Sequence, residues 1–280
     1  DVLAVRQALE ERGDDCYCPL LIAKLERPEA LENLAAILQV ADGVMVARGD
    51  LGVEMPPESV PIAQKRIITA ANRAGKIVIT ATQMLDSMIA NPLPTRAEAS
   101  DVANSIFDGT DAVMLSGETA SGAYPRESVA MMARIVSQAE IGFAEWGHLS
   151  IPNLATSDDA ASIARAAREL AHDLSVAAIV VFTHTGRSAL LLSKARPRVP
   201  ILALTPEEET MRRLALFWGV YPRLVPPSLN LREIIAQADA ALLESGMAAS
   251  GQQAVVVAGF PVSAVRAPNL AYLHNIGERL

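Results

Sequence analysis

The sequence predicts an α/β chain in two domains, a partial (β/α)8 barrel over residues 1–145 and an αβα sandwich over residues 146–280. Three observations support this fold class. Short apolar runs alternate with stretches of helical periodicity, the pattern of parallel strands joined by helices. Polar side chains follow each of the first four runs. The charge changes from 12 Lys and Arg against 21 Asp and Glu in residues 1–150 to 12 against 11 beyond them.

Composition excludes several classes of protein. The chain has 280 residues, 51% of them hydrophobic, which is enough for a sizeable core and argues against dominant disorder. No apolar run reaches the roughly 18 to 20 residues that span a bilayer, so no membrane segment is expected. The net charge of −8 argues against nucleic acid as a partner, because phosphate binding needs a basic surface.

The two cysteines and the N-terminus indicate a cytoplasmic protein. Cys16 and Cys18 are too close for an easy disulfide and lack the histidine partners of a zinc site, so we expect reduced thiols. The chain opens with Asp1 and has neither an initiator methionine nor a basic segment, so nothing suggests secretion. This opening also suggests that the chain lacks its beginning.

Four β/α units are expected in the first domain. The predicted strands are residues 20–23, 44–46, 77–79 and 112–115. One helix is expected from Pro28 onward, because Leu31, Leu34, Ala35 and Leu38 share one helical face. The other expected helices cover residues 60–73, ending at Gly75, then residues 97–107, and a stretch from about Pro125 with Val129, Met132, Ala133 and Val136 facing inward.

The polar residues favour a barrel over a doubly wound sheet. In a β/α barrel every strand delivers its carboxyl end to one shared site, whereas a doubly wound sheet usually decorates only the ends near its switch point. All four predicted strands carry such residues: Lys24 and Glu26, Arg48 and Asp50, Thr80 and Thr82, and Ser116 and Glu118. Four strands are nevertheless only half of the eight that close a barrel.

The second domain alternates in the same way after a boundary near residues 142–153. Helices are expected at 158–172, 187–195, 207–216 and 231–244, and parallel strands at 177–182, 199–204, 219–222 and 253–258. Residues 271–276 are expected to add an edge strand. This arrangement predicts a compact sandwich of helices around one sheet.

Lys24, Glu26 and Asp50 are the first candidate site. Residues i and i+2 of a strand point the same way, so Lys24 and Glu26 should lie side by side. Asp50, within Arg48-Gly49-Asp50-Leu51-Gly52, adds a second carboxylate from the next strand, giving the sparse oxygen set that Mg²⁺ takes. A cation and a metal at one pocket suit phosphoryl transfer or enolate chemistry. A rim ion pair and a plain turn are the structural alternatives.

The third and fourth strand ends give weaker signals. Thr80 and Thr82 are expected to share one face, but such hydroxyls often only satisfy local hydrogen bonds. In the segment around Gly117, Ser116 or Thr119 is expected to cap the following helix.

Four segments, in this order and at these spacings, resemble the pyruvate kinase family. They are KLER at 24–27, VMVARGDLGVEMP at 44–56, KRIITAANRAGKIVITATQMLDSMI at 65–89 and PTRAEASDVANSIFDGTDAVMLSGETASGAYP at 94–125. The resemblance covers nearly all of residues 1–140, and the later half is similar in layout to that family's C-terminal effector domain. It implies the second half of a TIM (β/α)8 barrel, strands five to eight, followed by the αβα domain.

The resemblance also implies residue roles. Glu26 and Asp50 match the ligands of Mg²⁺ or Mn²⁺, and Lys24 matches the lysine that stabilises the transferring phosphoryl group. Thr82 matches the threonine implicated in protonating the enolate, and the backbone around Gly49 and Asp50 matches the binding place of the substrate carboxylate. The implied reaction converts phosphoenolpyruvate and ADP to pyruvate and ATP, with K⁺ as a further cofactor and a homotetramer as the assembly.

This sequence departs from the family pattern in two ways. Arg27 and Asp86 replace residues that the family usually has, an asparagine and a glutamate. The family's barrel also begins with four further strands and an inserted lid domain, which bring a phosphate-binding arginine, monovalent-cation ligands and most nucleotide contacts. We therefore expect the 280-residue chain to be inactive by itself.

A second candidate site is Thr183-His184-Thr185-Gly186-Arg187-Ser188, between a predicted strand and a helix. Hydroxyls and free N–H groups at a helix start suit an anion, although an ordinary capped helix would look the same. The segment resembles the family's effector loop, which binds a sugar phosphate or nucleotide phosphate. The second effector loop, usually rich in glycine, appears as residues 260–269 without one, so a sugar monophosphate or an AMP-like effector is expected.

Two other functions remain open. One is a metal-dependent lyase acting on enolpyruvate, which also uses a glutamate and an aspartate on neighbouring strands. The other is a non-catalytic regulatory fragment that binds sugar phosphates. Three histidines, His148, His172 and His274, have no metal-like spacing, and Trp146 and Trp218 are expected to fill core or interface gaps.

Overall fold

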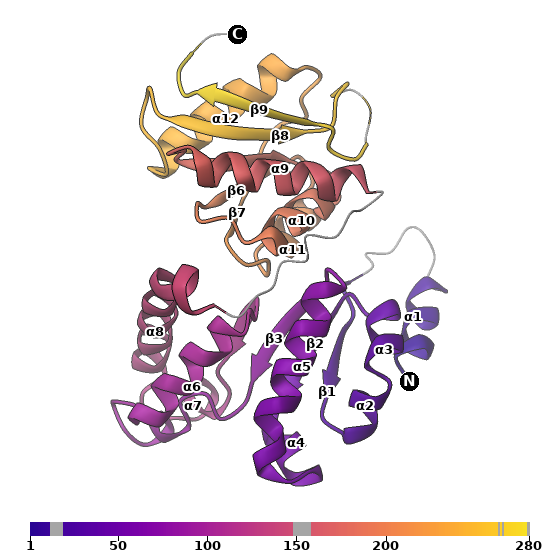
Figure 1. Cartoon of the computed structure of the whole chain (residues 1–280), viewed down its shortest axis with the longest axis vertical. Helices are drawn as coiled ribbons and strands as arrows, with labels where there is room; N and C mark the ends of the chain where they lie inside the picture. The colour runs from indigo at the N-terminus through magenta and orange to yellow at the C-terminus, as the bar shows by residue number, and fades with distance from the viewer. Residues whose placement is uncertain (12–18, 148–157, 263, 265, 279–280) are drawn as a thin grey trace. The chain divides into compact units, whose positions relative to one another are not determined.

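The computed structural model describes residues 1–11, 19–147, 158–262, 264 and 266–278. The chain divides into two compact units, Asp1–Ser150 and Ile151–Leu280 (Figure 1). Cys16, Cys18 and His148, which the sequence singled out, lie outside the described residues.

The first unit is built on a four-stranded parallel sheet in the order β1-β2-β3-β4. The strands are β1 (Ile22–Leu25), β2 (Gly43–Ala47), β3 (Ile77–Ala81) and β4 (Ala112–Met114). Strands that follow one another in the chain are neighbours in the sheet, as a barrel requires. The first strand begins two residues later than the sequence predicted, so Lys24 lies inside β1 and Glu26 directly follows it.

Helices connect these strands. They are α1 (Val2–Glu10), α2 (Pro28–Glu32), α3 (Leu34–Val40), α4 (Arg48–Glu54), α5 (Val60–Arg73), α6 (Arg96–Phe107), α7 (Gly117–Ala120) and α8 (Pro125–Trp146), with short 3-10 turns η1 (Pro57–Ser59) and η2 (Asp86–Ile89). The helix predicted from Pro28 is in fact two, because the chain leaves helical geometry at Asn33. The Asn33 side chain donates to the Glu29 carbonyl oxygen, a local bond that competes with the helix.

The core of the first unit lies between the sheet and α3 and α5. Val44, Val46 and Val78 pack against Ile67 and Ile68 of α5, and all five are fully buried. The sequence prediction for α8 was partly wrong: Met132 is buried, but Val129 and Ala133 are exposed. The inward face of this helix instead includes Ser128 and Ala139.

The second unit holds a five-stranded sheet in the order β7-β6-β5-β8-β9. Its strands are β5 (Ala178–Phe182), β6 (Ile201–Thr205), β7 (Val220–Leu224), β8 (Gln253–Ala258) and β9 (Leu270–Asn275), and its helices are α9 (Asp159–Asp173), α10 (Arg187–Ala195), α11 (Glu208–Leu214) and α12 (Leu231–Ser245). All pairings are parallel except that of β9 with β8, which is antiparallel. The expected edge strand is β9, and its direction was not predicted from the sequence.

Helices cover the sheet of the second unit. In Figure 1 the strands β8 and β9 are drawn between α12 and α9. Ile234 and Leu242 of α12 pack against alternate residues of β5 and β8, among them Val180 and Val256. This layering positions the segment after β5 at the carboxyl edge of the sheet, where α/β proteins place ligand sites. None of the described helices is long and apolar enough to cross a membrane.

Candidate functional site

The carboxyl ends of β1 and β2 bring one ammonium group and two carboxylates together. Lys24 Nζ lies 2.6 Å from Glu26 Oε2 and 2.7 Å from Asp50 Oδ2. Lys24 and Glu26 come from β1 and its end, and Asp50 comes from the first turn of α4, directly after β2. Parallel pairing of Leu25 with Val46 holds the two strand ends level. The three side chains that the sequence grouped do form one cluster.

This cluster is open to solvent. The side chains of Lys24, Glu26 and Asp50 are 49%, 44% and 51% exposed, so a substrate can reach all three. Hydrogen bonds from the ammonium group to Asp50 and then to Glu26 raise the pKa of Lys24 above its ordinary value of 10.5. Lys24 therefore stays cationic across the physiological pH range.

The donor set of the cluster fits a divalent metal that needs few protein ligands. No group of three or more His, Cys, Asp or Glu side chains in the described part of the chain forms a ready metal cage. Glu26 and Asp50 nevertheless turn an oxygen each toward the same cation, the Lys24 ammonium. Mg²⁺ commonly binds through one or two carboxylates, with water and substrate oxygens completing its octahedron. This pair could hold such an ion, and three or more protein ligands are not required.

Thr82 lies beside this cluster, in the turn that follows β3. Its Oγ1 accepts a hydrogen bond from the Gly49 N–H at 2.7 Å and donates one to the Ala81 carbonyl oxygen at 2.7 Å. Gly49 precedes Asp50, so the Thr82 hydroxyl contacts the same helix turn that carries the Asp50 carboxylate. The expectation that Thr80 and Thr82 share a face was wrong, because Thr82 lies past the strand and Thr80 bonds instead to Thr110.

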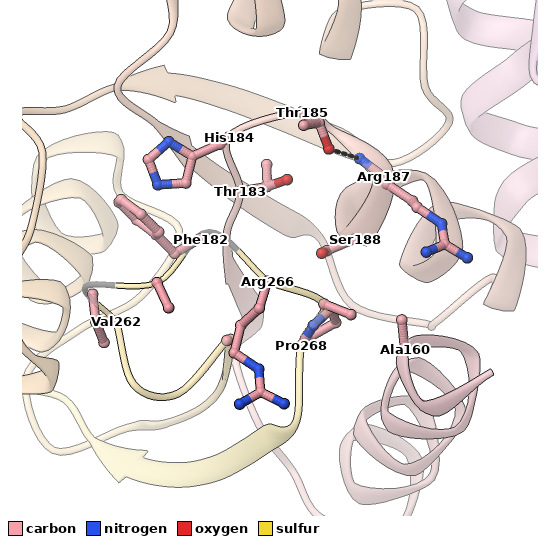
Figure 2. A pocket seen from close by; sticks show the side chains of 13 residues that line it. Ala160, Phe182, Thr183, His184, Thr185, Arg187, Ser188, Val262, Arg266 and Pro268 are labelled. Carbon is pink, nitrogen blue, oxygen red and sulfur yellow. Dashed lines mark hydrogen bonds between the residues drawn. The ribbon is translucent and has the colours of Figure 1, made fainter.

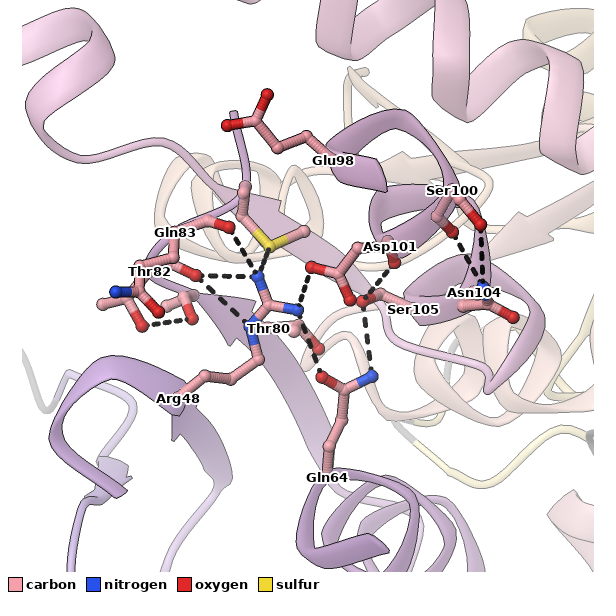
Figure 3. Close-up of polar contacts among 12 residues, drawn as sticks. Arg48, Gln64, Thr80, Thr82, Gln83, Glu98, Ser100, Asp101, Asn104 and Ser105 are labelled. Atoms are coloured by element: carbon pink, nitrogen blue, oxygen red, sulfur yellow. Dashed lines mark hydrogen bonds and ion pairs between the residues drawn. The ribbon is translucent and has the colours of Figure 1, made fainter. Parts of the chain in front are cut away.

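Sequence reasoning missed a buried network behind the Thr82 turn (Figure 3). Arg48 was expected among the polar side chains that the strand ends deliver to the shared site, but its guanidinium bonds to Thr82, Gln83, Gln64 and Asp101. Asp101 lies on α6, 53 residues further along the chain. No local sequence pattern could pair these two residues, since both occupy ordinary positions for surface charges.

Glu118, and not the expected Ser116 cap, holds the segment after β4. Ser116 or Thr119 was expected to cap the segment after β4, but the Ser116 side chain makes no capping bond. The Glu118 carboxylate, 2% exposed, instead accepts hydrogen bonds from the Ser116 N–H at 2.7 Å and the Leu85 N–H at 3.0 Å. It therefore ties the end of β4 to the segment after β3.

The segment Thr183–Ser188 lines a cavity of about 250 Å³ in the second unit (Figure 2). Thr183, His184, Thr185, Arg187 and Ser188 form one wall. The opposite wall comes from the loop after β8 and includes Arg266. Both segments of the expected effector site thus border one cavity.

Local bonds shape the Thr183–Ser188 segment. Thr183 Oγ1 accepts from the Gly186 N–H at 3.0 Å, and Gly186 has a φ of 85°, a left-handed value that favours glycine, immediately before α10. Arg187 forms an ion pair with Asp158 at 2.6 Å, and the His184 carbonyl oxygen accepts from Thr210 Oγ1 at 2.7 Å. The segment is a firmly built strand-to-helix turn.

Arg266 is held by its own loop. Its Nη1 donates to the Phe260 carbonyl oxygen at 3.2 Å. In Figure 2 the guanidinium lies apart from the Thr183 hydroxyl and from Ser188. The two sides of the cavity therefore differ, with hydroxyls and a helix start on one side and an internally bonded arginine on the other.

The other residues that the sequence left unassigned have local partners. His274 is buried and lies 2.8 Å from Asp239, and His172 Nε2 accepts from the Arg198 N–H at 3.2 Å. Arg196 stacks over the Trp218 ring at 4.4 Å. His172, His274 and Trp218 thus each have a partner within the second unit.

The fold and its sites define an α/β protein in which a parallel sheet carries a lysine–carboxylate cluster at its strand ends. A second α/β unit carries a cavity lined by hydroxyl groups and two arginines. Two family models match the chain: the barrel domain of pyruvate kinase over residues 1–129 and the alpha/beta domain of pyruvate kinase over residues 161–274.

Individual relatives agree with these models. The pyruvate kinase of Geobacillus stearothermophilus is 47% identical over 284 aligned residues, covering 100% of this chain and 48% of the relative. That of Clostridium perfringens is 46% identical, covering 99% of this chain and 58% of the relative. A crystal structure of a pyruvate kinase from Cryptosporidium parvum superposes with a TM-score of 0.88 at 39% identity, covering 98% of this chain and 56% of that one.

The chain belongs to the pyruvate kinase family. The fold class predicted from the sequence is confirmed, because the four-stranded sheet falls within the barrel-domain match and the five-stranded sheet corresponds to the alpha/beta domain. The chain spans about half the length of the curated relatives it matches.

Proposed function

We propose that this chain carries the metal-binding, lysine and threonine part of a pyruvate kinase, which transfers a phosphoryl group from phosphoenolpyruvate to ADP and yields pyruvate and ATP. The observation that supports this most directly is the position of the Lys24 ammonium between the Glu26 and Asp50 carboxylates at adjacent strand ends. Membership of the pyruvate kinase family supports the same assignment.

In this proposal each residue has its own role. Glu26 and Asp50 hold Mg²⁺ or Mn²⁺, which when bound offsets negative charge on the phosphoryl oxygens. Lys24 adds a fixed positive charge beside the transferring group, and its raised pKa keeps that charge in place. The helix turn around Gly49 and Asp50 faces the substrate carboxylate, and Thr82 directs a proton to the enolate carbon.

The Lys24 bonds imply a rearrangement when the metal binds. In the structure the single ammonium group pairs with both carboxylates, so one negative charge of the cluster is left uncompensated. Glu26 and Asp50 would hold a divalent ion through these same oxygens. Lys24, released from them, would then be available to the anionic substrate. The same three residues thus form an ion-pair cluster without substrate and a phosphoryl-binding site with it.

We propose that activity needs residues beyond those of this chain. The support is that the chain spans about half the length of its relatives and that β1 and β4 each have one neighbour strand among the described residues. Assaying ATP formation by the 280-residue chain and by the full-length gene product tests this. We expect turnover only in the full-length gene product. Turnover on the order of 1 to 100 per second by the chain alone would contradict the proposal.

We further propose that a sugar monophosphate or an AMP-like effector binds the cavity bordered by Thr183–Ser188, and that the protein is a cytoplasmic homotetramer that uses K⁺. The hydroxyls and the start of α10 support anion binding. The layout of the second unit and the family match support an effector domain.

The two alternative functions are less well supported. An enolpyruvate lyase would explain the Glu26–Asp50 pair but gives no role to the second unit, which the alpha/beta domain of pyruvate kinase matches. A purely regulatory fragment would explain the cavity but not the lysine–carboxylate cluster. Absence of ATP formation by the full-length gene product, together with retained sugar-phosphate binding, would favour the regulatory fragment.

A further inference from the structure

We propose that Arg48, fixed by Asp101, is a positioning residue that holds the Thr82–Gln83 turn in a strained conformation and so sets the place of the Thr82 hydroxyl. This inference rests on the proposed function of Thr82. Arg48 on α4 and Asp101 on α6 would thus act in the proposed reaction through Thr82, without contacting the substrate.

The turn is strained at two consecutive residues. Thr82 has a φ of 66° and Gln83 a φ of 52°, and in the described part of the chain only Arg196 is a further non-glycine residue with positive φ. Left-handed backbone is unfavourable for residues with a Cβ, and most of all for a β-branched residue such as threonine. Such residues persist only where the surrounding structure over-determines them.

Arg48 holds these two left-handed residues in place. Its Nη2 donates to the Thr82 carbonyl oxygen at 2.8 Å and to the Gln83 carbonyl oxygen at 3.1 Å, and its Nε donates to Thr82 again at 3.2 Å. Both carbonyls of the strained pair thus converge on one guanidinium (Figure 3). A rotation of either residue out of the left-handed region would turn a carbonyl away from this cation.

The guanidinium itself is fixed from the other side. Arg48 is 8% exposed, and its Nη1 bonds to Asp101 on α6 and, at 3.4 Å, to Gln64 on α5. Gln64 is held in turn by Asp108 at 3.1 Å. The buried positive charge is therefore paired and oriented by two helices, so it cannot follow the turn if the turn relaxes.

Glu118 closes the turn at its far end. Its carboxylate accepts from the Leu85 N–H, three residues after Thr82, and also from the Ser116 N–H beyond β4. With Arg48 on one side and Glu118 on the other, the segment is clamped between β2 and β4. The Thr82 side chain is left directed at the Gly49 N–H, next to Asp50.

The first experiment compares variants of the full-length gene product. We expect Arg48→Met and Asp101→Asn to lower kcat at least about tenfold while the KM for phosphoenolpyruvate and the affinity for Mn²⁺ change less than about twofold, because the turn carries Thr82 and not the metal ligands. Arg6→Met is the matched control: Arg6 also binds a carbonyl and an aspartate, Val40 and Asp42, but before β2. It should leave kcat unchanged.

A rescue separates positioning from general stability. Adding Gln83→Gly to Arg48→Met lowers the conformational free energy of a left-handed φ at position 83. The double variant should therefore have a kcat at least about threefold higher than that of Arg48→Met. Equal loss of kcat in Arg6→Met, or no recovery with Gln83→Gly, would overturn the proposal. If Arg48→Met does not fold, Arg48→Lys and Asp101→Asn serve instead, with the same expected split between kcat and KM.

A second readout does not depend on catalysis. Amide hydrogen exchange at Met84 and Leu85 in the full-length gene product should speed up at least about tenfold in Arg48→Met, because the turn opens locally. If the wild type made no ATP, the proposed function would fail while exchange still tested the turn. If the wild type is active and amide exchange at Met84 and Leu85 is unchanged in Arg48→Met, the positioning role of Arg48 is contradicted while the proposed function stands.

Discussion

The Gly49 N–H donates a hydrogen bond to the Thr82 hydroxyl oxygen at 2.7 Å, joining the first turn of α4 to the turn after β3. Gly49 adjoins Asp50, whose carboxylate binds Lys24 from β1. The ends of three neighbouring strands are thus linked through two adjacent residues. The Thr82 hydroxyl is therefore held next to the lysine–carboxylate cluster.

Substitutions of the two carboxylates and of Lys24 should have different effects on Mn²⁺ affinity. We expect Glu26→Gln and Asp50→Asn each to weaken Mn²⁺ binding by the full-length gene product at least about tenfold, because each removes a charged oxygen ligand. Lys24→Met should leave Mn²⁺ binding unchanged or strengthen it, since it removes a competing cation. Titration followed by electron paramagnetic resonance measures this. Weaker Mn²⁺ binding in Lys24→Met would show that the roles are not separate.

The Lys24 pKa provides a test that needs no activity. Asp50 is the largest cause of its upward shift and Glu26 the second, so Asp50→Asn should lower the Lys24 pKa toward 10.5 more than Glu26→Gln does. A raised lysine pKa stabilises the fold below about pH 10.5, and this contribution is lost as pH rises through the folded-state value. NMR titration of the Lys24 side chain measures both shifts. Identical titration in all three proteins would contradict the observed bonds.

His172 should make the second unit sensitive to acid. Burial, then Arg168 and Arg198, lower the His172 pKa below its ordinary 6.5, and the neutral Nε2 accepts the Arg198 N–H. The unfolded chain therefore binds the proton more readily than the folded chain. Neutral His172 contributes fully to the free energy of unfolding above pH 6.5, and this contribution is lost as pH falls through the lower His172 pKa of the folded state. We expect Tm to fall more between about pH 7.5 and about pH 5.5 in the wild type than in His172→Gln. Equal falls would refute this.

A second phosphate on a sugar ligand should add little to its affinity for the cavity of the second unit. Arg266 is bonded to its own loop, so a second phosphate gains little unless that bond breaks. In calorimetry on the full-length gene product, a sugar bisphosphate should bind less than about tenfold tighter than a monophosphate, a gap of about 1.4 kcal/mol. Ser188→Ala should weaken both ligands. A larger gap that disappears in Arg266→Ala would assign the second phosphate to Arg266, and no binding at all would leave an ordinary capped helix.

Much of the architecture was predictable from the sequence because it depends on local patterns. The 60–73 and 187–195 helices have the predicted bounds, and Gly75 has the expected left-handed φ. The helix break at Asn33 was missed because the apolar stripe continues across it. The break coincides with a hydrogen bond from the Asn33 side chain to the Glu29 carbonyl oxygen. Helical periodicity carries no information about such a bond.

The candidate site was only half predictable. Lys24 and Glu26 are two residues apart on one strand, and Asp50 follows the next strand, so their meeting follows from parallel pairing. The Arg48–Asp101 bond joins residues 53 positions apart and depends on how α4 and α6 are placed in three dimensions. The left-handed Thr82 was also unpredictable, since threonine argues against such a backbone wherever tertiary contacts do not impose it.

The most direct test of the account is the rate of ATP formation from phosphoenolpyruvate and ADP by the full-length gene product, with and without Lys24→Met. We expect turnover on the order of 1 to 100 per second in the wild type with Mg²⁺ and K⁺. We expect Lys24→Met to lower kcat on the order of 100-fold or more, with little change in KM, because it removes a positive charge that is proposed to stabilise the transition state. No ATP formation by the wild type, or equal kcat in the two proteins, would contradict it.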